Sequence, residues 1–262
     1  MNSKDLLAKL LANENLNIVR APVSTASFDI KHRTLTLPQW KDMSNTVEEM
    51  LIGHEVGHAL FTNEEYLKRD ENDPAILHGY MNVIEDVRIE KKFKNKYPGM
   101  RTTFIQAYKE LVERDFFELA GRDMSSLNLI DRINLYYKAG INCGVKFTEA
   151  EMEFVRKADR CDTIQDVYAL AKEILGYSRN ALKEKKEKRD NSLSLSPEDL
   201  EDMEELPEDF ELDSPMYDDG EEVEVDEEEK NEKRGAGSSE QTENPDGEID
   251  ERELESATES AL

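Results

Sequence analysis

The chain has 262 residues, with 34 Lys and Arg against 60 Asp and Glu and a formal net charge of −26. This acidic excess argues against a surface that neutralises phosphates, so we expect no nucleic-acid partner. No apolar run approaches the roughly 20 residues of a membrane span, and no signal peptide is visible, so we expect a cytoplasmic protein without a membrane partner.

The charge is distributed unevenly along the chain. Residues 1–190 hold 30 Lys and Arg against 31 Asp and Glu, a net of −1, whereas residues 191–262 hold 4 against 29, a net of −25. The second range also has few apolar side chains to offset the entropy of ordering. We therefore predict a globular domain over 1–190 and a disordered acidic tail over 191–262.

The N-terminal residues predict a helix followed by a small sheet. Residues 3–12 form a short amphipathic pattern whose leucines, at positions 6, 7, 10 and 11, should face inward. Residues 17–20 have the composition of a strand, and the alternating segments 26–30 and 34–37 predict a β-hairpin. The hairpin either pairs with an extended substrate by strand addition or only covers the core.

Residues 50–61 contain His-Glu-x-x-His in an apolar segment, and a capping pattern starts the helix near Thr46. Residues four apart lie about 40° apart around a helix, so His54 and His58 point the same way and can bind one metal ion. Glu55 lies beside them, where a general base for an activated water belongs. The alternative is an exposed helix with two chance histidines; the apolar flanks oppose it, because buried histidines need partners.

A second helix should supply the third ligand that a catalytic zinc requires. This helix is expected from about Pro74 to Lys94, with Asp73 as its N-cap. Glu85 is the expected ligand, and Asp86 is expected to orient a ligand histidine. Two alternatives stay open, namely Asp86 as the ligand and a solvated acidic face paired with basic neighbours.

Three more residues of the second helix are candidates for the site. His78 and Asn82 share a helix face with Glu85. His78 or Tyr80 could donate a hydrogen bond to the oxyanion of a hydrolytic transition state.

Residues 54–61 (His-Glu-Val-Gly-His-Ala-Leu-Phe), followed by residues 82–90 (Asn-Val-Ile-Glu-Asp-Val-Arg-Ile-Glu), resemble a gluzincin-type metallopeptidase domain. The likeness is nearest to the peptidase-like region of phage and bacterial proteins related to the von Willebrand A-containing cobaltochelatase subunit. It implies that Glu85 of the second helix completes a zinc site, and it implies the host cytoplasm if the chain is phage-encoded. No von Willebrand A domain is expected to follow, because the chain ends at Leu262.

The remaining sequence up to residue 190 predicts helices over 102–119, 127–138, 148–160 and 163–189, with Thr148 and Glu151 as the capping pair of the third. The predicted fold is therefore a mostly helical α+β domain, with a zincin-like metal helix, a small N-terminal hairpin or sheet and a helical C-terminal part.

Three hypotheses about function follow. The first is zinc-dependent hydrolysis of a peptide or protein substrate. The second is a non-catalytic metal-binding adaptor, because the similar cobaltochelatase subunit works with a ring ATPase; its partners would be that ATPase or a von Willebrand A protein. The third is an acidic tail that binds basic proteins or mimics nucleic acid. A three-ligand metal site favours the first hypothesis, and a closed four-ligand site favours the second.

Overall fold

A computed structural model describes residues 2–68, 70–140, 143–193 and 254–256. Residues Met1–Glu184 and Ile249–Leu262 belong to one unit and Lys185–Glu248 to a second, most of which lies outside the described residues. The described residues are mostly helical and include a small three-stranded sheet, which confirms the mostly helical α+β class. Most of the tail expected over 191–262 lies outside the described residues. None of the described helices is long and apolar enough to cross a membrane.

The sheet has the order β1-β3-β2, formed by β1 (Asn17–Ala21), β2 (Ser27–Asp29) and β3 (Thr34–Pro38). Strands β2 and β3 pair antiparallel, which confirms the hairpin, and β1 pairs parallel to β3. Leu35 and Leu37 of the central strand are fully buried. Because β3 is paired on both sides, only β1 and β2 have an outer edge to offer an extended peptide.

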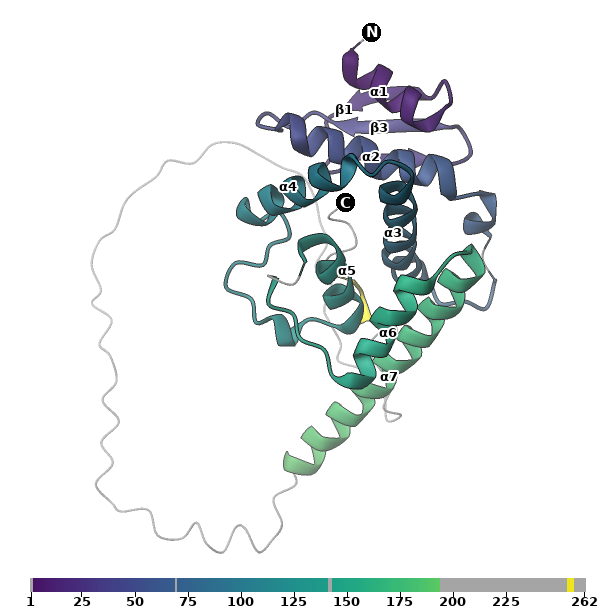
Figure 1. The fold of residues 1–262 in the computed structure, drawn as a ribbon. Coiled ribbons are helices and arrows are strands. Elements are labelled where there is room, and N and C mark those ends of the chain that lie inside the picture. Colours follow the sequence, from purple (N-terminus) through teal and green to yellow (C-terminus); the bar gives the residue numbers. More distant parts are fainter. Residues whose placement is uncertain (1, 69, 141–142, 194–253, 257–262) are drawn as a thin grey trace, which may run out of the picture. The chain divides into compact units, whose positions relative to one another are not determined.

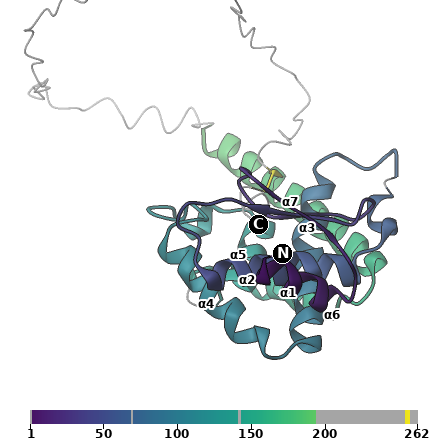
Figure 2. The ribbon, with the colours of Figure 1, turned by 90° about the horizontal axis from the view of Figure 1, so that it is seen from above.

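Helix α1 (Ser3–Ala12) has the predicted bounds but not the predicted inner face. Ala8 and Ala12 are buried, whereas Leu6 and Leu10 are 48% and 68% exposed. Helices α1 and α2 (Asn45–Phe61) lie side by side (Figure 2). The small alanine side chains let the two helices approach closely; Leu6 and Leu10 are left exposed, whereas Leu7 and Leu11 are half-buried and Leu11 packs against the core.

Helix α2 begins at Asn45, one residue before the predicted start. Its N-cap is Ser44, whose hydroxyl accepts from the Val47 amide at 3.1 Å. Two glycines of α2 allow a close approach of other helices. A Cβ atom at Gly57 would lie 2.8 Å from Ile89 Cδ1, and one at Gly53 would lie 2.9 Å from a ring atom of Phe93. The glycine inside His-Glu-x-x-His therefore lets α3 cross α2 beside the histidines.

Helix α3 (Leu77–Lys96) begins later than expected and runs across the direction of α2 (Figure 1). Residues 74–76 form a turn whose carbonyls accept from the amides of 77–79, so Asp73 does not cap the helix. The Asp73 carboxylate instead accepts from Tyr168 at 2.8 Å and pairs with Lys172 at 2.9 Å. The predicted N-cap thus ties the loop before α3 to a later helix.

The later helices match the sequence expectation in number but not in every bound. One of them is shorter than predicted, because the chain leaves the helix at residue 114 and takes a positive φ at Asp115 and Glu118. Thr148 and Glu151 form the predicted capping box. The bounds are α4 (Met100–Glu113), α5 (Leu129–Ala139), α6 (Glu149–Arg160) and α7 (Ile164–Leu193), with short 3-10 turns at Glu64–Leu67 and Met124–Ser126.

Two hydrophobic clusters form the core. The first joins α1, the sheet, α2 and α4, and the second joins α3, α5, α6 and α7. The residues at which α2 meets α3 lie where the two clusters adjoin, and they include the His-Glu-x-x-His segment. The fold therefore places the two histidines and the glutamate of this segment between the two hydrophobic clusters.

Residues 254–256 pack against the second cluster, although they belong to the range expected to be disordered. Leu254 is 1% exposed, and its carbonyl accepts from the Tyr80 hydroxyl at 3.0 Å. Asn128 donates to the carbonyl of Glu255 at 3.0 Å, and the Ser256 hydroxyl donates to Asp131 at 2.8 Å. This short segment therefore contributes to the stability of the unit that contains the core.

We expect Leu254→Ala to lower the free energy of unfolding by about 2 kcal/mol, the lower end for a buried leucine, because the segment can detach and be rehydrated. Urea denaturation of the full chain measures this change. Leu10→Ala is the matched control, because Leu10 is 68% exposed and its loss should cost less than about 0.5 kcal/mol. Equal effects of the two substitutions would show that the segment does not stabilise the fold.

Candidate metal centre

Three side chains from two helices converge between α2 and α3. His54 and His58 come from successive turns of α2, and Asp86 comes from α3. One ligand atom from each lies within 4.8 Å of the other two. Asp86 Oδ1 is 3.5 Å from His54 Nε2 and 3.2 Å from His58 Nε2. The group is enclosed, with side-chain exposures of 2%, 13% and 4%.

Hydrogen bonds on the far side of each ring fix which nitrogen faces the group. His54 Nδ1 is 3.0 Å from Glu90 Oε1, a carboxylate that accepts, so Nδ1 carries the proton. His58 Nδ1 is 3.0 Å from Thr62 Oγ1. That hydroxyl donates to Glu85 Oε1 at 2.5 Å, so it accepts from His58. In the neutral form of each ring, Nε2 is then left with a lone pair directed toward Asp86.

Asp86 Oδ1 provides a direct test of whether the residues fit a metal. This oxygen is buried and has no hydrogen-bond partner among the described residues, whereas Oδ2 pairs with Lys138 at 3.1 Å. When both imidazoles are neutral, two nitrogen lone pairs and one carboxylate oxygen face one another. A cation bound by all three resolves this arrangement, and two imidazoles with one carboxylate are a zinc-type donor set.

The third member of the group is Asp86, where the sequence analysis expects Glu85. Glu85 is fully buried, but its carboxylate accepts from Arg88 at 2.6 and 2.7 Å and from Thr62. Arg88 is fixed in turn by the Phe61 carbonyl at 2.7 Å. Glu85 therefore supports His58 through Thr62 and is not brought to the two histidines.

The electrostatic field of the group favours a positive charge. Burial alone would lower the pKa of His54, but Asp86 and Glu90 outweigh burial and raise this pKa to about 10. Burial would raise the pKa of Asp86, yet Lys138 and His54 hold it well below its usual range. Burial also opposes ionisation of Glu90, and Lys94 and His54 nonetheless lower its pKa to about 2. Two ionised carboxylates thus flank His54.

Glu55 is 4% exposed and lies on α2 next to the first histidine. Burial is the largest influence on its carboxyl group and raises its pKa, while the nearby charges of His54 and His58 oppose that shift. A raised pKa makes the ionised carboxylate a stronger base than a solvated one, which suits it to accept a proton.

The other three sequence candidates contact different parts of the molecule. Asn82 accepts from the Tyr66 hydroxyl at 3.2 Å, and the ring of His78 lies 5.6 Å from that of Tyr66. Tyr80 is fully buried and donates to the carbonyl of Leu254. Burial raises the pKa of Tyr80 to about 12. The structure therefore does not bring these three residues to the histidine pair.

Several supporting residues were not assigned a role from the sequence. Glu90 is one helical turn beyond Asp86 on the same face of α3, a spacing that could have identified it. It also accepts from the Tyr108 hydroxyl and pairs with Lys94 at 2.7 Å. Tyr108 and Lys138 come from α4 and α5 and have no local sequence signal.

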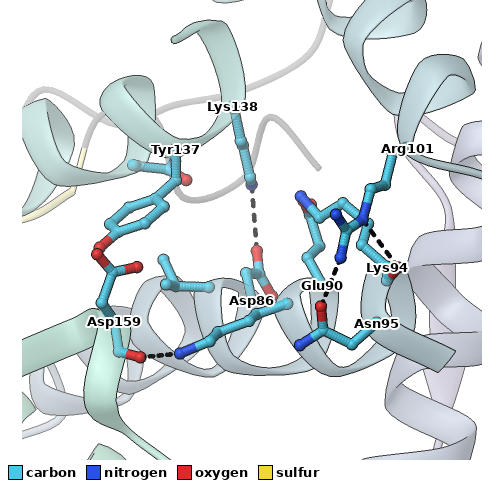
Figure 3. Close-up of a pocket in the computed structure, with 11 residues that line it drawn as sticks. Asp86, Glu90, Lys94, Asn95, Arg101, Tyr137, Lys138 and Asp159 are labelled. Atoms are coloured by element: carbon cyan, nitrogen blue, oxygen red, sulfur yellow. Dashed lines mark hydrogen bonds and ion pairs between the residues drawn. The ribbon is translucent and has the colours of Figure 1, made fainter. Parts of the chain in front are cut away.

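A pocket of about 270 Å³ adjoins the group on the side of Asp86. Figure 3 shows Asp86 and Glu90 on its α3 wall, with the Lys138 side chain extending from α5 to the Asp86 carboxylate. The pocket is therefore bounded by Asp86 and Glu90, whereas the two histidines and Glu55 are not among its lining residues.

Comparisons with known proteins return no relative: no protein-family model, no curated protein and no solved structure matches this chain.

Proposed function

We propose that this protein is a zinc-dependent peptide hydrolase whose metal is held by His54, His58 and Asp86. The observation that carries the proposal is the buried Asp86 Oδ1, which lies 3.5 and 3.2 Å from the two Nε2 atoms and has no hydrogen-bond partner among the described residues. Three protein ligands leave a coordination position open, which is the arrangement of catalytic rather than structural zinc sites. When bound, the ion would polarise a carbonyl group and lower the pKa of a water molecule.

The residues of the chain itself supply the remaining chemistry. Glu55 would take the proton of the attacking water and pass it to the leaving amine. Glu90 and Thr62 hold the two imidazoles in the required tautomer. Lys138 holds Asp86 in its ionised form and fixes the direction of its carboxylate. The buried surroundings exclude bulk water and strengthen each of these interactions.

The adaptor hypothesis is the second candidate, and the enclosure of the group favours it. His54, Asp86 and Glu55 are each below 5% exposed, as they are in metal sites that only hold a fold together. An adaptor would work with a ring ATPase or a von Willebrand A protein, as the resemblance in the sequence implies. Against it, the described residues gather three ligand groups rather than four.

Metal analysis of the purified full chain tests the proposal. We expect about one zinc per chain by plasma mass spectrometry over manganese, iron, cobalt, nickel, copper and zinc. We also expect hydrolysis of a mixed peptide library, lost on chelation and restored by zinc. Zinc without any hydrolysis would favour the adaptor. Occupancy by iron, or by no metal, would contradict the proposed centre.

A further inference from the structure

The pocket beside Asp86 is lined mainly by charged side chains from α3 and α5. Its volume is about 270 Å³. It adjoins a groove of about 620 Å³ between α4 and α5. Four residues line both, namely Lys94, Arg101, Tyr137 and Lys138. Together they are in the size range of ligand sites. Basic side chains outnumber acidic ones in the pocket: Lys91, Lys94, Arg101 and Lys138 against Asp86, Glu90 and Asp159.

Two of the three acidic side chains of the pocket, Asp86 and Glu90, already have basic partners. Asp86 pairs with Lys138, and Glu90 pairs with Lys94. Both carboxylates also support the histidine group through their inner oxygens. They are therefore not available to neutralise further cations.

Arg101 faces this pocket with neutral partners. Its Nε donates to the Lys94 carbonyl at 3.1 Å, and its Nη2 donates to Asn95 Oδ1 at 2.7 Å (Figure 3). An arginine has five N–H groups, so these two bonds orient the guanidinium and leave three N–H groups for a ligand. Lys91 donates to the backbone carbonyl of Asp159, another neutral acceptor. Among the described contacts, neither cation has a carboxylate partner, and an oriented guanidinium is suited to a carboxylate.

The adjoining groove is apolar where it runs along α4. Ile105 is 70% exposed and Val112 is 38% exposed, and both line the groove together with Phe104. A ligand that fits both the pocket and the groove has a negatively charged group for the pocket and, a few atoms away, an apolar side chain for the groove. Peptides are the substrate class of the proposed hydrolase, and acidic peptides combine these features.

We propose that the pocket binds a carboxylate of a peptide at Arg101, with an apolar residue of that peptide in the groove beside Ile105. This inference rests on the proposed function for the choice of a peptide. The binding itself requires no hydrolysis, so it can be measured separately. It would make the proposed hydrolase selective for acidic peptides.

Fluorescence anisotropy with the full chain tests the pocket. The probe is a labelled pentapeptide with leucine at its third position and glutamate at its C-terminus. One matched peptide has glutamine in place of glutamate, a second has an amidated C-terminus, and a third has both changes. We expect the third to bind at least tenfold more weakly, and the first two show whether the side-chain or the terminal carboxylate is bound. Mass spectrometry after each titration confirms that the peptide is intact.

Arg101→Glu should weaken binding of the acidic peptide at least tenfold, and the effect should diminish in high salt. Arg122→Glu is the control, because this substitution makes the same change of charge outside the pocket. The ion-pair contact of Arg122 is with Glu118, at 3.7 Å. Equal affinity for the acidic and the doubly changed peptide would overturn the inference, and so would equal effects of the two arginine substitutions. Zinc content and hydrolysis are not used in this test, so its failure leaves the proposed function standing.

Discussion

Asp86→Asn is expected to lower the affinity of the chain for zinc by more than about a hundredfold, whereas Glu85→Gln should stay within the ~10–100-fold range of supporting residues. The reason is the position of the two carboxylates. Asp86 Oδ1 faces both imidazoles, while Glu85 reaches His58 only through the Thr62 hydroxyl. Asparagine keeps an oxygen acceptor for Lys138, so the substitution does not leave that buried ammonium without a partner.

Competition with a fluorescent zinc chelator measures both affinities, and circular dichroism shows whether each variant folds. The two substitutions are matched, because each replaces a buried carboxylate by its amide on neighbouring positions of one helix. A larger loss of zinc affinity in Glu85→Gln than in Asp86→Asn would show that Glu85 is the ligand. Equal and small losses would show that neither carboxylate binds the metal.

The distinction between these two carboxylates explains how far the sequence could predict the site. A helical spacing places His54 and His58 on one face because both belong to a single element. The choice between residues 85 and 86 depends on the rotation of α3 about its axis. That rotation is fixed by packing against other helices, including the contact of Ile89 with Gly57 and the hydrogen bond from Arg88 to the carbonyl of Phe61. A single sequence contains no direct signal of it.

The same limit applies to the fold. Hydrophobic periodicity predicted the hairpin and the bounds of α1, and the spacing of Thr148 and Glu151 predicted the capping box. All three features depend on residues that are neighbours in the sequence. The parallel pairing of β1 with β3 and the burial of Leu254 depend on contacts between distant segments, and periodicity does not report them. Lys138 was missed for the same reason, since it reaches Asp86 from a helix 52 residues away in sequence.

Glu55→Gln is expected to abolish hydrolysis while leaving zinc bound, because it removes a proton acceptor and not a ligand. Loss of a general base lowers rates by roughly 10²–10⁴-fold. Glu64→Gln is the control, since Glu64 is an exposed glutamate of the same chain. Rates with a cleaved library peptide, measured at equal zinc occupancy, give the comparison.

The stability of the Glu55→Gln variant separates a catalytic glutamate from a structural one. Glu55 is 4% exposed, and burial raises its pKa, so its ionised form is disfavoured in the folded chain. A neutral amide at this position should therefore leave the free energy of unfolding unchanged or raise it. A glutamate retained for packing or pairing would instead lose stability on substitution. Hydrolysis that survives in the zinc-loaded variant would show that another group accepts the proton, and a loss of zinc together with stability would make Glu55 part of the support of the metal group.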